Sequence, residues 1–238
     1  MSFLTAEWRK LCFANYEVPP EVLKEYVPAH TELDFFEGKC YVSLVGFLFD
    51  KVKLRGISIS FHTRFEEINL RFYVKRKING QDRRGTVFIS EVVRKPAIAW
   101  VANLLYNENY SLRKMHFNHH LTTTENVISY ALREKNNKWM QIEMTTNIEP
   151  KPFREGGKTE FITQHYWGYG KKNDHQSHEY EVRHPKWEEY QVKNHKIEMD
   201  FGSLYGNTFA FLNQKKPDSV QVMEGSPISI EGKRVLGS

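Results

Sequence analysis

The sequence predicts an α+β domain built on a large, mostly antiparallel and curved β-sheet. Segments with strand character outnumber segments with helix character, and the helical segments are short and lie between strands. The 238 residues include 16 Phe, 12 Tyr and 5 Trp, and bulky aromatic side chains suit strands and the interiors of barrels. Residues 41–49, YVSLVGFLF, are almost continuously apolar. This pattern indicates a strand that is buried on both faces.

The chain begins with a strand and a short helix. Residues 8–16 form the first expected strand, and the pair Pro19–Pro20 ends it. A short helix is expected over residues 21–26, because a proline directly precedes it. The apolar strand 41–49 follows.

A hairpin and a helix come next. Residues 67–75 alternate between polar and apolar side chains, and Asn79–Gly80 is a strong signal for a type I′ turn. The polar run 81–84 predicts a longer, frayed hairpin, with the return strand over 86–93. Pro96 then opens a helix that is expected to end near residue 106.

The second half of the chain is expected to be strand-rich and to contain one more short helix. A Pro/Gly loop is expected over 151–158, and the tail over 220–231 alternates like one or two edge strands. The remaining expected elements are strands 113–120, 126–134 and 138–146, a helix 159–165, and strands near 179–184 and 188–198. No linker or repeat divides the chain, so residues 1–238 are expected to form one domain.

Composition excludes several classes of protein. The net charge is +5, but 34 basic and 29 acidic residues are scattered, whereas a nucleic-acid binder usually has a clustered basic patch. Cys12 and Cys40 make neither a disulfide framework nor a zinc ligand set and are expected to be buried thiols. Without a signal peptide or a membrane-spanning segment, the chain is expected to be soluble and cytoplasmic. Homo-oligomerisation stays open.

The strand 67–75 carries the most informative polar pattern. Glu67, Asn69, Arg71 and Tyr73 share one face because side chains alternate along a strand. The other face carries Ile68, Leu70, Phe72 and Val74. Two interpretations are open. The polar face is either solvated, as in an ordinary half-buried strand, or it lines a closed cavity that holds a ligand.

Several segments resemble the YqjF-like proteins, a branch of the acetoacetate-decarboxylase-like superfamily. They are E-x-N-x-R-x-Y-V from Glu67, TVFIS over 86–90, residues 106–115, TEFITQHY over 159–166 and RHPKW over 183–187. The last departs from the H-H-P-P-W common in that family. The resemblance implies a cone-shaped β-barrel with a few short helices, and it favours the cavity interpretation of the polar strand face.

The resemblance also implies that the best-known chemistry of the superfamily is missing. When Tyr106 and Leu112 are matched to the decarboxylase segment, its reactive lysine falls on Tyr110 and the activating lysine on Ser111. An imine requires an amine, and a tyrosine phenol has none; it stays neutral and donates a hydrogen bond. Lys114 is four positions away and matches a later lysine of the family. Schiff-base decarboxylation is therefore not expected.

Two histidine-containing segments have less specific interpretations. His116, His119 and His120 form the pattern H-x-x-H-H. His116 and His120 share a strand face but are about 13 Å apart, which is too far for one ion, and no matching carboxylate or cysteine spacing accompanies them, so no metal site is expected. In the segment 183–187, proline forces His184 to be extended, and Trp187 is expected to be a packing anchor. A ligand contact by His184 or Trp187 is the alternative.

The leading hypothesis is a protein that binds a small carboxylate or carbonyl compound in a barrel cavity, with no cofactor and no metal. Arg71 would hold the carboxylate or carbonyl oxygen, and Glu67 would orient Arg71 or accept a ligand proton. The expected ligand-binding residues are Asn69, Arg71, Tyr73 and Ser111. The competing hypothesis is a lyase or isomerase in which Glu67 is the general base and Tyr110 donates to an oxyanion. A third is an interaction protein with a solvated strand face.

Overall fold

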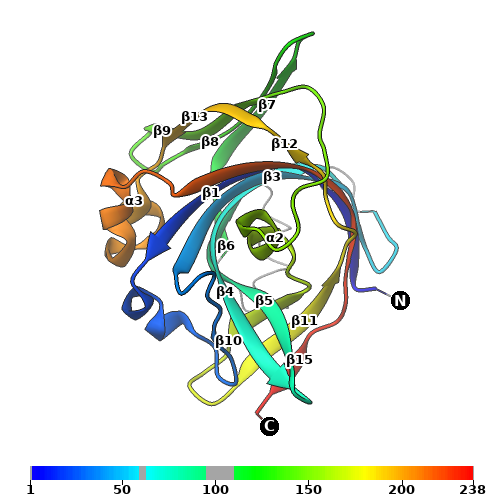
Figure 1. Cartoon of the computed structure of the whole chain (residues 1–238), viewed down its shortest axis with the longest axis vertical. Coiled ribbons are helices and arrows are strands. Elements are labelled where there is room, and N and C mark those ends of the chain that lie inside the picture. Colours follow the sequence, from blue (N-terminus) through cyan, green and yellow to red (C-terminus); the bar gives the residue numbers. More distant parts are fainter. Residues whose placement is uncertain (1, 59–62, 95–109, 238) are drawn as a thin grey trace.

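The main sheet closes into a ring around a short helix (Figure 1). The computed structural model describes residues 2–58, 63–94 and 110–237, and only the backbone of Tyr110. In this part of the chain, seven strands follow one another around the ring, and β11 pairs with β14 to close it. In ring order they are β14 (Ser219–Ile230), β1 (Leu4–Val18), β3 (Cys40–Leu54), β4 (Phe65–Ile78), β5 (Gln81–Val93), β10 (Trp167–Lys171) and β11 (Ser177–Arg183).

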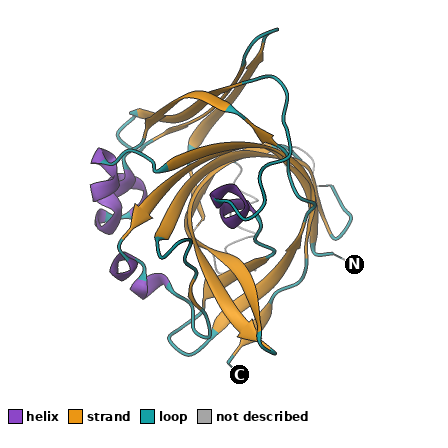
Figure 2. Cartoon of the chain, in the orientation of Figure 1, coloured by secondary structure: helices purple, strands orange, loops and turns teal. Residues whose placement is uncertain are grey.

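The ring has an inner and an outer apolar face, and helix α2 (Lys158–Thr163) lies inside it (Figure 2). Alternation along β3 places Val45 and Phe47 in the inner cluster and Leu44 in the outer one. All residues from Cys40 to Phe49 are buried. The prediction that 41–49 is a strand buried on both faces is therefore confirmed: ring closure buries the inner face, and elements packed outside the ring bury the outer one.

The hairpin between β4 and β5 has a tight turn. Asn79 and Gly80 have φ angles of 50° and 81°, and Ile78 pairs directly with Gln81. The type I′ turn is confirmed, but the prediction of a frayed hairpin is wrong. The polar run continues the ladder because its long side chains find partners on other strands: Arg83, for example, pairs with the buried Glu179 of β11 at 3.2 Å.

A second sheet packs on the outside of the ring (Figure 1). Its order is β13-β9-β8-β7. Its strands are β7 (Lys114–Leu121), β8 (Asn126–Arg133), β9 (Trp139–Thr146) and β13 (Val192–Glu198). The two sheets approach closely at Gly46 of β3, where an added Cβ would lie 2.8 Å from the ring of Tyr130. The Tyr130 hydroxyl donates to the backbone oxygen of Lys10 at 2.8 Å.

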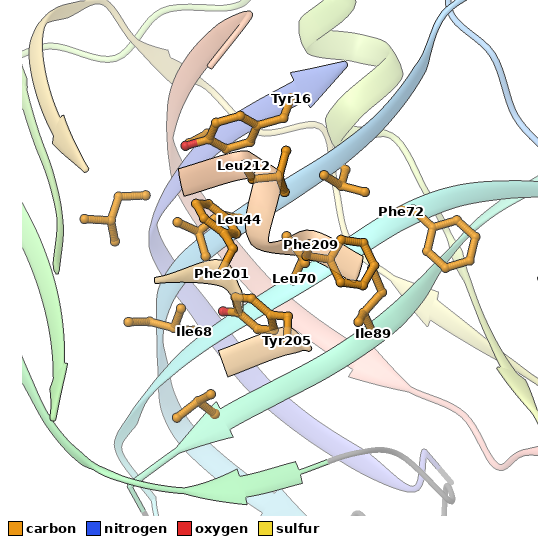
Figure 3. Close-up of a cluster of buried hydrophobic side chains, with 14 of the residues drawn as sticks. Tyr16, Leu44, Ile68, Leu70, Phe72, Ile89, Phe201, Tyr205, Phe209 and Leu212 are labelled. Carbon is orange, nitrogen blue, oxygen red and sulfur yellow. The ribbon is translucent and has the colours of Figure 1, made fainter. Parts of the chain in front are cut away.

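Helical segments near the carboxyl end cover another part of the outer face. They are α3 (Phe201–Tyr205) and the 3-10 helix η3 (Asn207–Gln214). Figure 3 shows Phe201, Tyr205 and Phe209 packed near Leu44 and Leu70 of the ring. The sequence did not predict these helices. Their apolar residues pack on a surface that β1, β3 and β4 form together. The local sequence pattern therefore does not predict these helices.

The remaining elements are short, and a prediction about the long tail strand is wrong. They are the 3-10 helices η1 (Pro20–Val22) and η2 (Lys24–Tyr26), and strands β2 (Glu32–Leu33), β6 (Tyr110–Leu112), β12 (Glu189–Tyr190) and β15 (Arg234–Leu236). The tail strand β14 is not an edge strand, because β1 pairs with it on one side and β11 and β12 on the other. Alternation cannot distinguish an edge from an interior strand when both partners are remote in sequence.

Four further expectations have different outcomes. Cys12 and Cys40 are free and buried, as predicted. The helix expected over 96–106 falls outside the described residues. Among the described residues, none of the helices has the length and apolar character needed to cross a bilayer. The assignment of residues 1–238 to one domain stays a prediction.

Candidate functional site

A cavity of about 100 Å³ lies within the ring. This is room for a molecule of a few non-hydrogen atoms, since one water occupies about 30 Å³ of the liquid. Aromatic side chains make up much of the wall, and the polar groups form a smaller set. Among the described residues, the lining polar side chains are Glu67, Asn69, Arg71, Thr86, Glu91, Thr163, His165 and His184. A mostly apolar pocket with a few polar groups is the usual form of a small-molecule site.

Strand β4 supplies three of these polar groups from a single face. Glu67 and Asn69 are each 1% exposed and Arg71 is 7% exposed. The interpretation of this face as solvated is wrong, because ring closure turns it inward, where it lines the cavity; that the cavity holds a ligand stays a prediction. The Asn69 amide Nδ2 donates to Glu67 Oε1 at 2.9 Å.

The sequence did not single out Glu91, the second carboxylate of the wall. Glu91 is 2% exposed and lies opposite Asn69 in the β4–β5 ladder. The register shifts between Leu70 and Arg71, so that Ile89 is an extra residue on β5. Strict alternation from Thr86 would have put residue 91 on the outer face, and the bulge moves it to the inner face.

Arg71 has few partners for a buried cation. Its Nη2 donates to the backbone oxygen of Ile162 at 3.2 Å, and its guanidinium carbon lies 5.0 Å from the centre of the Phe13 ring. Its buried Nε has no hydrogen bond, and Arg71 forms no ion pair with any residue that the structure describes. A buried charge without an ion-pair partner is costly.

Tyr73 lies beside the cavity and is not among its lining residues. Its hydroxyl is hydrogen-bonded to Ser43 Oγ on the neighbouring strand, and its ring stacks on His165 with the ring centres 4.6 Å apart. The structure therefore does not bring the Tyr73 hydroxyl to the ligand space. The partner on β3 that holds it away could not be identified from the β4 pattern alone.

Strand β6 carries the other two predicted site residues. Ser111 is partly buried, its backbone pairs with Val92 of β5, and it does not line the cavity. The backbone of Tyr110 pairs with Glu91, and its side chain lies outside what the structure describes. Lys114 is exposed on β7 and does not line the cavity either. Among the described residues, no lysine lines the cavity.

His165, two residues beyond α2, is buried in the cavity wall. Burial lowers the pKa of its imidazole well below the usual value, and the nearby cations Arg84 and Arg71 lower it further. The imidazole is therefore neutral at pH 7. Sequence analysis matched this histidine to the family segment but gave it no role, because only the position of α2 inside the ring brings it to the cavity.

His184 and Trp187 form a stacked pair in the same wall. Their ring centres are 4.4 Å apart, and the Trp187 indole Nε1 donates to Ser226 Oγ at 2.9 Å. Burial lowers the pKa of His184. Trp187 is thus a packing anchor, as predicted, and both residues also line the cavity.

The histidines of β7 lie on the surface. His116 packs against the ring of Trp139, and His119 is hydrogen-bonded to Asn126. Within the described ranges, no group of three metal-ligating side chains occurs.

The sequence matches a known family over most of its length. Residues 5–227 match the sequence profile of DUF2071, described as an uncharacterized conserved protein. The chain belongs to this family. The uncharacterized protein YqjF of Bacillus subtilis (strain 168) is 32% identical over 71 residues, an alignment that spans 29% of each chain. The resemblance to YqjF-like proteins is confirmed.

Solved structures share the fold at low sequence identity. Acetoacetate decarboxylase from Legionella pneumophila is 13% identical with a TM-score of 0.67, and the match covers 98% of this chain and 86% of that one. An acetoacetate decarboxylase-like enzyme from Sphingomonas wittichii RW1 is 11% identical with a TM-score of 0.67, covering 100% and 94%. The enduracididine biosynthesis enzyme MppR, complexed with pyruvate, is 9% identical with a TM-score of 0.67, covering 99% and 91%. The DUF2071 chain therefore has an acetoacetate-decarboxylase-like α+β fold.

Proposed function

We propose that this DUF2071 protein binds a small carboxylate or carbonyl compound in the ring cavity without forming a Schiff base. The observation that carries the proposal is Arg71, a buried guanidinium in the cavity wall with no ion pair among the described residues. A carboxylate in the cavity would supply the missing counter-charge through charge-assisted hydrogen bonds. The aromatic wall would cover the apolar part of the same ligand.

A structural neighbour supports this ligand class. MppR is a protein complexed with pyruvate, a three-carbon 2-oxo acid that carries a carboxylate next to a carbonyl group. A cavity of about 100 Å³ has room for a molecule of this size. Arg71 can donate from both Nε and an Nη atom, so its fork suits the adjacent carboxylate and carbonyl oxygens of a 2-oxo acid.

The proposal excludes an imine because none of the described lysines lines the cavity. The family position of the reactive lysine is Tyr110, and Lys114 is exposed outside the cavity. An enzymatic alternative is a lyase or isomerase in which Glu67 is the general base and Tyr110 the oxyanion donor. It is supported by the burial of Glu67 within the same wall, where the Asn69 amide orients its carboxylate.

The test is calorimetric titration of the purified protein with pyruvate. Wild type should bind, and Arg71→Ala should weaken binding, because truncating one partner of a buried charged pair costs about 2–5 kcal/mol. Glu67→Gln should change mainly the pH dependence of binding. Arg154→Ala, which removes an exposed arginine outside the cavity, is the matched control. Equal affinity of wild type and a folded Arg71→Ala protein would contradict the proposal.

A further inference from the structure

His165 is a buried side chain whose ring nitrogens make no well-formed hydrogen bond to the described residues. It is 7% exposed, and neither ring nitrogen has a hydrogen bond of good geometry to any described residue. Buried polar groups in folded proteins nearly always have a partner. Two aromatic rings hold the imidazole in place instead: Tyr73 stacks on it, and Phe161 meets it edge-on with ring centres 5.9 Å apart. The ring is thus oriented while its nitrogens remain available to the cavity.

His165 and Arg71 approach the same space from two elements. His165 follows α2, while Arg71 lies on β4, and both line the cavity. Tyr73 is their common neighbour: the Arg71 guanidinium carbon lies 5.7 Å from the Tyr73 ring centre, and His165 stacks at 4.6 Å. A short ligand held by Arg71 therefore lies within reach of the imidazole.

The protonation state of His165 suits a base. The largest influence on its pKa is burial, which lowers it, and Arg84 of β5, Arg71 of β4 and the His184 ring lower it further; a backbone contact with Ile162 acts in the opposite direction without reversing the shift. The imidazole is therefore neutral, and one of its two nitrogens carries a lone pair that can accept a proton. A carboxylate bound to Arg71 would offset one of these cations and raise the pKa of His165, which increases its strength as a base.

Two other candidate bases of the wall, Glu67 and His184, have hydrogen-bonded side chains. Glu67 Oε1 accepts a hydrogen bond from Asn69. The His184 ring is stacked between Tyr166 and Trp187, and its Nδ1 lies 2.9 Å from the backbone oxygen of Pro185. The ring of His165 also meets a backbone group, at Ile162, but that contact lacks the geometry of a hydrogen bond.

We infer that His165 removes a proton from the carbon next to the carbonyl group of a short 2-oxo acid held by Arg71. This inference rests on the proposed function. The C–H bond breaks, the proton moves to an imidazole nitrogen, and the electron pair forms a C=C bond while the carbonyl π pair moves to oxygen. The Arg71 guanidinium stabilises the resulting enolate. The reverse step returns a proton to carbon, so the cycle needs no oxidant or second substrate.

The test is the exchange of methyl protons of pyruvate for deuterium in D₂O. The exchange rate is measured from the decay of the methyl signal in the ¹H NMR spectrum. Wild type should accelerate the exchange above buffer. His165→Gln should reduce the enzymatic rate by at least about 100-fold, the lower range for a general base, while calorimetry shows pyruvate still bound. His120→Gln, which changes an exposed histidine of β7, should exchange at the wild-type rate.

A second variant separates chemistry from packing. In His165→Ala, added imidazole should restore the exchange above the rate of imidazole with pyruvate alone, because a small base can enter the space that the side chain leaves. Undiminished exchange in a folded His165→Gln protein would overturn the inference. Wild-type protein that binds pyruvate without accelerating exchange would also overturn the inference. In that case the proposed binding function would still hold. Absence of pyruvate binding by wild type would overturn both.

Discussion

Replacing Arg71 with methionine should leave the stability of the empty protein nearly unchanged while removing its response to a small carboxylate. Methionine keeps much of the buried aliphatic volume and removes the charge. If Arg71 were part of a structural ion pair, breaking that pair would instead cost about 3–5 kcal/mol. Because Arg71 has no ion pair among the described residues, the two roles predict different outcomes.

The magnitude follows from the contacts of Arg71. The substitution removes one charged hydrogen bond to Ile162, worth about 1.5–3 kcal/mol. It also removes cation–π contacts with Phe13 and Tyr73, each worth about 0.5–2 kcal/mol. Against this loss, the desolvation penalty of a buried ion, several kcal/mol, disappears. The stabilisation lost with these contacts and the desolvation penalty removed with the charge are similar in size. The free energy of unfolding should therefore change by less than about 1.5 kcal/mol.

The assay is urea unfolding of wild type and Arg71→Met with and without pyruvate. At a ligand concentration of 100 Kd, wild type should gain about 2.7 kcal/mol, and Arg71→Met should gain nothing. A loss of more than about 3 kcal/mol in the ligand-free variant would show that Arg71 is a structural residue. Equal stabilisation of both proteins by pyruvate would refute the assignment of Arg71 as the anion-binding group.

Three other predictions concern the core, the acid response and the absent imine. Leu44→Ala should lower the free energy of unfolding by about 2–5 kcal/mol, because Leu44 is 0% exposed between the ring and its outer cover; a loss below about 1 kcal/mol in urea unfolding would contradict its place in the core. Burial raises the pKa of Glu179, but Arg234, Tyr169 and Arg76 outweigh this and hold it below 4.5. Its ionised form therefore stabilises the fold above pH 4.5, and this stability is lost as pH falls through the folded pKa; unfolding curves of Glu179→Gln should be less pH-dependent in this acid range, and identical acid dependence in both proteins would argue against it. Acetoacetate with borohydride should leave no reduced adduct on Lys114, whereas a stoichiometric adduct in peptide mass spectra would restore the decarboxylase interpretation.

Local patterns predicted the strands well because their causes are local. The Asn79–Gly80 turn needs two positive φ angles, which these two residues adopt readily. The alternation along β4 placed Glu67, Asn69 and Arg71 on one face, and the structure has them together in the cavity wall. Alternation could not show whether that face was exposed to solvent. The face is buried because the ring closes, and closure depends on the pairing of β11 with β14.

The missed site residues depend on features that are not local. Glu91 reaches the inner face through a bulge at Ile89, and a single extra residue reverses the alternation that follows it. His165 reaches the cavity because α2 enters the ring. Conversely, Tyr73 had the right strand face, but its hydroxyl is held by Ser43 of β3. Each of these outcomes is decided by contacts between segments that are far apart in sequence.

The most direct test of the central claim is a crystal structure of the protein soaked with pyruvate. We expect the ligand inside the ring, with carboxylate or carbonyl oxygens at about 2.7–3.1 Å from the Arg71 guanidinium nitrogens and its methyl carbon toward His165. An empty cavity at saturating pyruvate, or pyruvate bound only at the outer surface, would contradict the account.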